Sequence, residues 1–182
     1  SAVDAAIAAN AARGLMEPTG NGIGGDLFAI VWDPETEEVV GLNASGRSPQ
    51  SLSYDALKQE LGERDQIPYW GALPVSVPGA VSGWGKLHNR FGELPLEDVL
   101  APAIQYARDG FPVSKVIAYY WQGNIRRFEY EDDVIPDENW KDTYLVEGED
   151  GALRAPREGE MFRNPDLANT LETIAQNGTE AF

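Results

Sequence analysis

Residues 43–49 form a short segment whose residue types suit the binding of an anion. The segment reads Asn-Ala-Ser-Gly-Arg-Ser-Pro, and Gly46 and Pro49 constrain the backbone on either side of Arg47. The planar guanidinium group of an arginine can hold a carboxylate through two parallel hydrogen bonds. A loop arginine in an acidic protein more often forms a surface ion pair, so the segment alone fits both roles. Arg47 is the candidate substrate-binding residue if a site forms around it.

A glycine-rich segment at 20–25, Gly-Asn-Gly-Ile-Gly-Gly, fits the G-x-G-x-x-G pattern of dinucleotide-binding loops. Such a loop follows a strand and opens a helix, which places the pyrophosphate at the helix N-terminus. Here a predicted helix precedes the segment and a predicted strand follows it, and Asn43 stands where an acidic residue would be needed. The pattern favours a structural role, because glycines let the backbone turn through positive φ and approach another backbone or a ligand closely. We expect this segment to form a wall of a site.

Residues 73–84, Leu-Pro-Val-Ser-Val-Pro-Gly-Ala-Val-Ser-Gly-Trp, predict an extended segment that passes into a helix. Pro78 ends the extended part, and the small residues after it allow the helix to pack closely against a neighbour. His88, the one histidine of the chain, lies on this predicted helix with no acidic residue or nucleophile at a suitable spacing. This context favours a structural histidine over a catalytic one.

The composition argues against several classes of function. The 182 residues contain no Cys, so thiol nucleophiles, disulfides and Cys-bound zinc are ruled out for this chain. Thirty acidic residues against fourteen basic ones give a net charge of −16, which argues against binding to nucleic acid or to an anionic membrane surface. No apolar stretch is long enough to span a membrane, no signal peptide is visible, and we expect neither a metal nor a cofactor.

Hydrophobic periodicity predicts the elements that must position these segments. Two β-rich apolar runs at 26–32 and 38–42, separated by the turn residues of 33–36, predict a β-hairpin. Helices are predicted at 1–12, 54–61, 80–91, 96–108, 114–128 and 165–176. The acidic, weakly patterned stretch at 130–159 is expected to be mostly irregular.

Individual residues refine these elements. Pro102 predicts a kink in its helix, or a break at Ala101. The aromatic residues Tyr119, Tyr120 and Trp121 are interpreted as a core between packed helices.

The ends of the chain have unusual features. The run at 1–12 is apolar nearly all round, which requires cover on more than one side, with Ser1 as N-cap and Asp4 at the third helical position. The last residue is an aromatic one, Phe182, with no partner segment. We expect 1–182 to be a piece of a longer polypeptide, truncated at both ends.

Taken together, these segments resemble the gamma-glutamyltranspeptidase family of N-terminal-nucleophile hydrolases, in the family's order and over nearly the whole chain. The familiar members carry Gly where Asp26 stands and an Arg-Glu pair where this chain has Arg47-Ser48. The Asn-Ala-Ser-Gly-Arg form of residues 43–47 resembles that of a divergent bacterial or archaeal branch of the family. The matching residues lie in 2–8, 17–18, 22–26, 43–49, 77–79, 100–113 and 164–182.

The resemblance implies an α+β fold that is part of a four-layer αββα sandwich, incomplete in this chain, with 1–182 as the large-subunit portion of a precursor. Autocleavage of such a precursor exposes a Thr at the start of the small subunit, and this Thr is the nucleophile with its own α-amine as base. The motif of that nucleophile, Thr followed by Thr or Ser and then His, occurs nowhere in 1–182. The chain therefore holds no catalytic residue and alone should be inactive. Arg47 matches the family's arginine that binds the α-carboxylate of the γ-glutamyl group.

Three functions stay open on this basis. The first is a γ-glutamyl hydrolase or transferase acting on compounds such as glutathione, with the small subunit of the same precursor as its protein partner. The second is an acylase of the same fold that removes a dicarboxylic side chain of the glutaryl or cephalosporin type. The third is a non-catalytic module that binds a carboxylate ligand or a partner through the Arg47 segment. If the fold is the family's sandwich, part of it is absent from 1–182, and the open strand faces and sheet edges predict self-association or association with a cleaved remainder.

Overall fold

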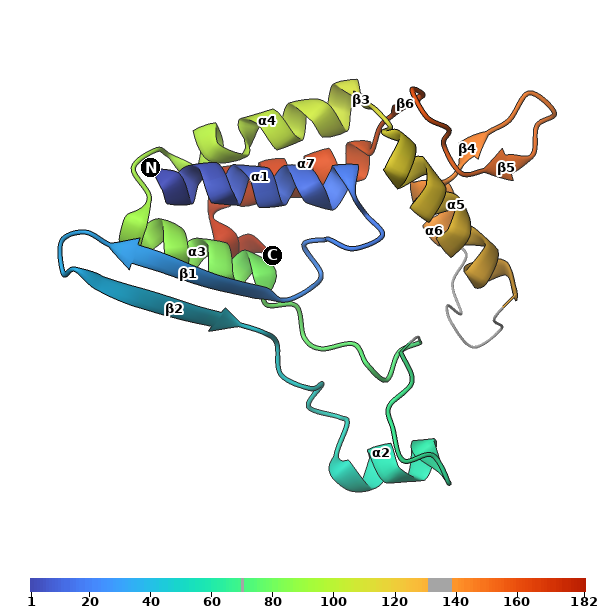
Figure 1. The fold of residues 1–182 in the computed structure, drawn as a ribbon, viewed down its shortest axis with the longest axis horizontal. Coiled ribbons are helices and arrows are strands. Elements are labelled where there is room, and N and C mark those ends of the chain that lie inside the picture. Colours follow the sequence, from blue (N-terminus) through green and yellow to red (C-terminus); the bar gives the residue numbers. More distant parts are fainter. Residues whose placement is uncertain (70, 131–138) are drawn as a thin grey trace.

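The computed structural model describes residues 1–69, 71–130 and 139–182 (Figure 1). Its helices and paired strands place it in the expected α+β class, and every predicted helix and the predicted hairpin are present close to their expected bounds. The elements follow in the order α1 (Ala2–Met16), β1 (Leu27–Asp33), β2 (Glu38–Ala44), α2 (Tyr54–Leu61), α3 (Ala80–Phe91), α4 (Leu96–Asp109), β3 (Phe111–Pro112), α5 (Lys115–Tyr130), α6 (Asn139–Tyr144), β4 (Val146–Glu147), β5 (Leu153–Arg154), β6 (Met161–Phe162), α7 (Pro165–Asn177) and a 3₁₀ turn, η1 (Thr179–Ala181).

Strands β1 and β2 form an antiparallel hairpin in which Leu27 lies opposite Ala44 and Asp33 opposite Glu38. Successive side chains of a strand point to opposite faces, so the apolar run of β1 is divided between two environments. The inner face packs on the helices through Leu27, Ala29, Val31 and Leu42. The outer hairpin face consists of Phe28, Ile30, Trp32 and Val39, which are 68%, 83%, 58% and 67% exposed.

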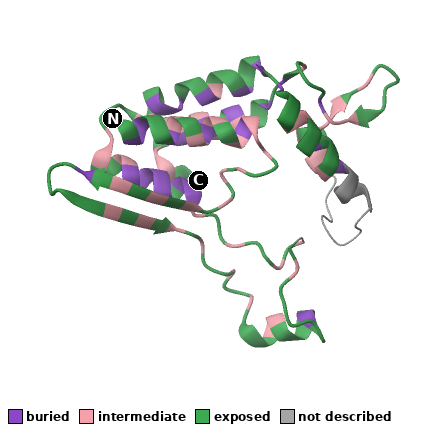
Figure 2. Cartoon of the chain, in the orientation of Figure 1, coloured by how far each residue is buried: buried purple, intermediate pink, exposed green. Residues whose placement is uncertain are grey.

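The helices pack on one side of this hairpin. Helices α1, α4 and α7 lie side by side, and α3 lies between them and the strands (Figure 1). Buried faces of these helices meet in one apolar cluster, whose largest fully buried side chain is Trp84 of α3 (Figure 2). The indole N–H of Trp84 donates to Asn10 Oδ1 of α1 at 2.8 Å, so this buried polar group is satisfied. The connection from β2 to α3 carries α2 away from the helices (Figure 1).

A buried carboxylate joins the first helix to the α3–α4 connection. Ser1 caps α1 and forms the expected capping box with Asp4, which is only 3% exposed. Asp4 accepts hydrogen bonds from the Ser1 ammonium group at 2.7 Å, from Glu93 N–H at 3.0 Å and from Leu94 N–H at 3.3 Å. In the isolated chain 1–182, these donors, with the Ser1 ammonium group first, hold the pKa of the Asp4 carboxyl well below its usual range.

A second apolar cluster forms where α5 meets β3, β6 and the start of α7. Trp121 is buried there, with its ring edge-on to Phe162 at 4.7 Å between centroids, and its indole N–H donates to the Tyr144 carbonyl. The interpretation of the neighbouring aromatics as core is wrong for two of them. Tyr119 and Tyr120 are 74% and 54% exposed, because residues adjacent in a helix cannot share the face that Trp121 buries.

Two further expectations need correction. Helix α4 continues through Pro102, so the break at Ala101 is wrong. The stretch at 130–159 contains α6, β4 and β5 and is less irregular than expected, although 131–138 lie outside the described residues. None of the helices that the structure describes combines the length and apolar character needed to cross a membrane.

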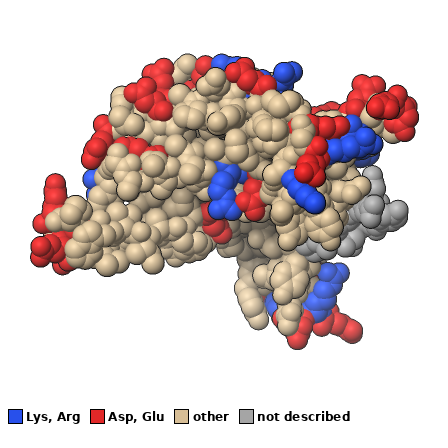
Figure 3. Space-filling view, turned by 45° about the horizontal axis from the view of Figure 1, so that its top comes forward, with Lys and Arg blue, Asp and Glu red and all other residues tan. Residues whose placement is uncertain are grey.

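Charged side chains gather at the hairpin turn and over the outer helices, and the surface of the strands is mostly uncharged (Figure 3).

Replacing Asp4 by Asn is expected to destabilise the protein by about 1–3 kcal/mol, because buried donors lose a charged acceptor. The folded state lowers the pKa of this carboxyl, so its contribution is complete above the unfolded value of about 3.9 and is lost as the pH falls through the folded value. Urea unfolding of the isolated chain 1–182 and of its Asp4→Asn variant, measured from about pH 6 downwards, should therefore give a difference that shrinks below about pH 4.

The matched control is Asp65→Asn, since Asp65 is exposed and no side-chain hydrogen bond is found for it among the described residues. This variant should change the free energy of unfolding by no more than about 0.5 kcal/mol. A loss in Asp4→Asn that is the same at every pH would contradict the role assigned to the ionised carboxyl.

Candidate functional site

The glycine segment at 20–25 meets the start of α3 through a shared backbone acceptor. The carbonyl oxygen of Gly25 accepts hydrogen bonds from Gly79 N–H and Ala80 N–H, each at 3.0 Å. These donors belong to the first turn of α3, where backbone N–H groups have no partner within the helix. The contact ties the residue just before Asp26 to the segment around Pro78.

The Arg47 segment is held by the same two regions. Asp26 Oδ1 accepts hydrogen bonds from Gly46 N–H at 2.9 Å and from the Ser76 hydroxyl at 3.0 Å. The carbonyl oxygen of Arg47 accepts a hydrogen bond from Val77 N–H at 2.8 Å. The three segments singled out in the sequence, 20–25, 43–49 and 73–84, therefore come together at the end of the hairpin where β1 begins and β2 ends.

The place where segments 20–25, 43–49 and 73–84 meet is called the junction here. Glycine is required at two of its positions because two backbones approach each other closely. A Cβ atom on Gly46 would lie 1.5 Å from the carbonyl oxygen of Val77, and one on Gly79 would lie 2.2 Å from the carbonyl oxygen of Ala44. Neither backbone oxygen can move aside as a flexible side chain would. The expectation of close helix packing after Pro78 is met by Gly83 as well, whose Cβ would lie 2.8 Å from Ala44 Cβ.

The glycine-rich segment itself differs from expectation. None of Gly20, Gly22, Gly24 and Gly25 has a positive φ, and a Cβ on Gly22 or Gly24 would meet no described atom within 4 Å. The expected left-handed turns are therefore wrong for this segment. Its contact with the site is made by the Gly25 carbonyl and by the residue that follows, Asp26.

The side chain of Arg47 is exposed, and no hydrogen bond or ion pair joins it to a residue that the structure describes. Hydrogen bonds hold the Gly46 N–H before Arg47 and the carbonyl oxygen of Arg47 itself, whereas its guanidinium group remains available. This differs from the surface ion pair that a loop arginine in an acidic protein more often forms. The arrangement suits the capture of a carboxylate from a bound molecule.

Asp26 carries the negative charge of the junction. The N–H of Gly46, followed by the hydroxyl of Ser76, holds the pKa of the Asp26 carboxyl below its usual range. In the sequence, Asp26 stands out as the first residue of a predicted strand and as a departure from the familiar family members, and neither feature indicates its role in joining the segments. Ser76 was missed too, since an isolated serine in an extended segment gives no signal of its partner.

His88 has the structural role that was expected. It is half-buried on α3, and its Nε2–H donates to the carbonyl oxygen of Leu94 at 2.7 Å. Because Leu94 also donates its N–H to Asp4, the same loop is held from two sides. His88 therefore stabilises the α3–α4 connection.

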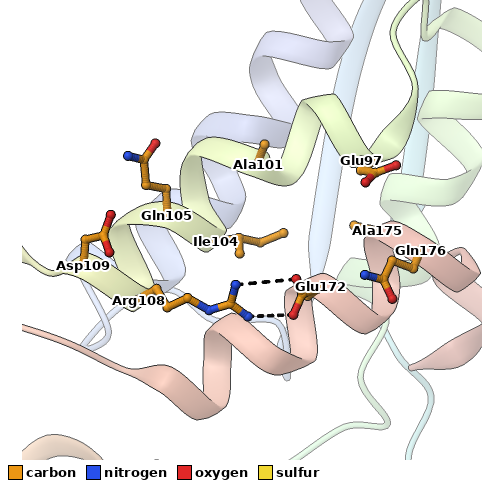
Figure 4. Close-up of a pocket in the computed structure, with 9 residues that line it drawn as sticks. All are labelled: Glu97, Ala101, Ile104, Gln105, Arg108, Asp109, Glu172, Ala175 and Gln176. Atoms are coloured by element: carbon orange, nitrogen blue, oxygen red, sulfur yellow. Dashed lines mark hydrogen bonds and ion pairs between the residues drawn. The ribbon is translucent and has the colours of Figure 1, made fainter.

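A separate hollow of about 360 Å³ lies between α4 and α7 (Figure 4). Its Arg108 already pairs with Glu172, with one nitrogen–oxygen distance of 2.6 Å, so this guanidinium is occupied. No residue of the three site segments lines it. Among the residues that the structure describes, no cluster of His, Cys, Asp and Glu side chains could hold a metal ion.

Comparison with solved structures identifies the class of protein to which this fold and site belong. The chain superimposes over its whole length on a cephalosporin acylase from Bacillus halodurans, with a TM-score of 0.86, 44% identity and 32% of that chain covered. It also superimposes on the gamma-glutamyltranspeptidase of Helicobacter pylori, with a TM-score of 0.85, 26% identity and 49% of that chain covered. The fold is that of the N-terminal-nucleophile hydrolases of this type.

The chain belongs to the gamma-glutamyltranspeptidase family, whose profile matches residues 1–182. A curated relative, the glutathione hydrolase-like YwrD proenzyme of Bacillus subtilis, is 34% identical over 183 residues, which cover 100% of this chain and 32% of the relative. The chain thus spans about a third of the length of the curated relatives that it matches. The resemblance recognised in the sequence is confirmed.

Replacing Gly46 by Ala should disrupt the Arg47 segment, because the added methyl group overlaps the Val77 carbonyl and the two backbones must separate. We expect the Val77 amide, which donates to the Arg47 carbonyl, to exchange its hydrogen at least about tenfold faster. Amide hydrogen exchange of the protein and the variant checks this expectation.

Gly123→Ala is the matched control, since Gly123 lies on the exposed side of α5 and a Cβ there meets no described atom within 4 Å. In Gly123→Ala, the Val77 amide should exchange its hydrogen at the same rate as in the unchanged protein. Slow exchange at Val77 in Gly46→Ala would show that the two segments do not depend on this close approach.

Proposed function

We propose that the protein containing this chain is a γ-glutamyl hydrolase or transferase that acts on glutathione-type substrates, and that 1–182 is the large-subunit portion of its precursor. In this proposal Arg47 binds the α-carboxylate of the γ-glutamyl group. The observation that carries the proposal is the fixed backbone of Arg47 combined with a guanidinium group that no described residue occupies.

The proposed role follows from charge and geometry. A bidentate contact between an arginine and a carboxylate contributes about 1.5–3 kcal/mol, and it also fixes the orientation of the bound group. In a chain of net charge −16, an anionic substrate is repelled by most of the surface, so a local cation is needed to hold it. Fixing the α-carboxylate at Arg47 leaves the γ-amide carbonyl at a defined distance for attack by a nucleophile.

The nucleophile is proposed to lie outside this chain. No Thr of 1–182 is followed by Thr or Ser and then His, and the matched relatives are about three times as long as this chain. Several of these relatives are named as proenzymes. The chain alone should therefore form no acyl-enzyme and show no turnover of γ-glutamyl amides.

An acylase that removes a dicarboxylic side chain is the second candidate. It is favoured by the 44% identity to the Bacillus halodurans cephalosporin acylase, which exceeds the 26% identity to the Helicobacter pylori enzyme. Both substrate classes present a carboxylate to Arg47, so the site alone suits both. Parallel assays of the complete protein with γ-glutamyl and glutaryl amides separate these two candidates.

A non-catalytic module that binds a carboxylate ligand or a partner through the Arg47 segment is the third candidate. It predicts that the gene does not continue into a Thr-Thr-His junction beyond Phe182. The downstream sequence of the gene decides between this candidate and the two enzymes.

In the complete protein, Arg47→Ala should lower kcat/KM for a γ-glutamyl amide about ten- to a hundredfold, because the carboxylate loses its charged partner. Arg47→Lys should cost less, since it keeps the charge and loses only the planar pair of donors. Neither variant should slow the hydrolysis of an analogue that lacks the α-carboxylate, and the precursors of both variants should still cleave themselves.

Arg64→Ala is the matched control, since Arg64 is exposed and has no side-chain partner among the described residues. Steady-state kinetics on both substrates, with precursor cleavage followed by gel electrophoresis, provide the measurement. Equal losses on the two substrates in Arg47→Ala would mean that Arg47 only shapes its loop.

The outer hairpin face is proposed to be covered by the remainder of the longer polypeptide. Four large apolar side chains stand on it without cover, and about two thirds of the length of the matched relatives lies outside this chain. Exposed apolar patches of this kind drive association. We therefore expect the isolated chain to self-associate, and coexpression with the remaining polypeptide to yield a complex instead.

Ile30→Lys should weaken the self-association of the isolated chain, whereas Thr36→Lys at the exposed hairpin turn adds the same charge and should not. Light scattering over a concentration series measures the degree of self-association of the unchanged chain and of both variants. A compact monomer at all concentrations for the unchanged chain would contradict the proposed cover.

A further inference from the structure

A single carboxylate oxygen joins three distant parts of the chain at the candidate site. Asp26 lies directly before β1, and its Oδ1 accepts from Gly46 N–H at 2.9 Å and from the Ser76 hydroxyl at 3.0 Å. The two donors lie 20 and 50 residues further along the sequence. Hydrogen bonds to an ionised acceptor are stronger than those between neutral groups, so this link is suited to hold two loops together.

The link acts on the backbone on both sides of Arg47. Gly46 N–H, held by Asp26, belongs to the residue before Arg47, and the Arg47 carbonyl is held by Val77, the residue after Ser76. No ion pair joins Asp26 to the Arg47 guanidinium within the part of the chain that the structure describes. Asp26 therefore fixes the loop without occupying the cation.

The surrounding backbone leaves the loop little freedom to move independently. Gly46 lies so close to Val77 that it has no room for a side chain, and Asn43 Oδ1 accepts from Ser45 N–H at 2.9 Å within the same loop. On the other side, the Gly25 carbonyl is bound by two N–H groups at the start of α3. Asp26 is thus anchored to α3 through its own preceding peptide.

We propose that Asp26, supported by Ser76, is the positioning residue of the carboxylate site and sets the place of the Arg47 guanidinium through the loop backbone. This inference rests on the proposed function for its effect on substrate, and on the hydrogen bonds alone for its effect on the loop. Asp26 does not touch substrate in this arrangement.

The test uses the complete protein with Asp26→Ala, Asp26→Asn and Ser76→Ala, beside Arg47→Ala. Asp26→Ala should raise KM for a γ-glutamyl amide about tenfold and change kcat less than about twofold, since the nucleophile is untouched. Asp26→Asn keeps an acceptor oxygen and should recover most of the loss. Ser76→Ala keeps the Gly46 contact and should raise KM only about two- to threefold.

Amide hydrogen exchange provides a measurement that does not depend on substrate. The amides of Gly46 and Val77 should exchange about tenfold faster in Asp26→Ala and near the original rate in Asp26→Asn. Unchanged exchange in Asp26→Ala overturns the inference. If Asp26→Ala does not fold, Ser76→Ala decides: an unchanged KM together with unchanged exchange at Gly46 and Val77 in this variant overturns the inference too.

The two proposals can fail separately. If Arg47→Ala affects substrates with and without an α-carboxylate equally, the proposed function fails, and faster exchange in Asp26→Ala still supports the link between the loops. If Arg47→Ala is selective for the α-carboxylate and Asp26→Ala leaves KM unchanged, the positioning role fails and the function stands.

Discussion

The close approach between the end of β2 and the first turns of α3 is the constraint on which the candidate site depends. Gly79 and Gly83 face Ala44 with no space for a side chain between them. Any larger residue would push the hairpin away from α3, and with it the two segments that leave the hairpin at this end. Packing at van der Waals distance thus sets the position of the loop that carries Arg47.

The hairpin is fixed at its other end by charge. Asp33 at the turn accepts a hydrogen bond from the Arg90 guanidinium of α3 at 3.2 Å, and its other oxygen accepts from Glu35 N–H. Asp33 is buried and the Arg90 side chain is half exposed, so solvent screens this pair only in part, and the pair adds to the packing of the inner hairpin face. A rigid hairpin held at both ends is a better support for a binding loop than a flexible one.

The same hairpin divides its two faces between two functions. Its inner face completes the core of the described chain, and its outer face has apolar side chains that the described residues leave exposed. The candidate site lies at the end of this hairpin, where β1 begins and β2 ends. The proposed role of the chain in substrate recognition fits this placement, because loops at the end of a hairpin can contact both the chain and whatever covers its outer face.

Local sequence determined the elements of this protein to a large extent. The bounds of α2 and α3 follow from hydrophobic spacing and from the residues that cap or end the helices, and the capping box at Ser1 and Asp4 was readable in the same way. Arg47 was identified by its residue type and by Gly46 and Pro49, which constrain the backbone on either side of it. The family was recognised because many matching residues occur in one order along the chain.

Only the tertiary structure decided what these residues do for one another. The role of Asp26 depends on donors 20 and 50 residues away, and no local pattern records a partner at that distance. Sequence periodicity also could not show that Tyr119 and Tyr120 are exposed while Trp121 is buried, since the burial of a helix face depends on which neighbour covers it. The glycines divide in the same way: Gly46 and Gly79 are needed because another backbone lies against them, whereas Gly22 and Gly24 have open space. Residue types specify local conformation through short-range sterics, and the contacts that build a site are set by the packing of distant segments.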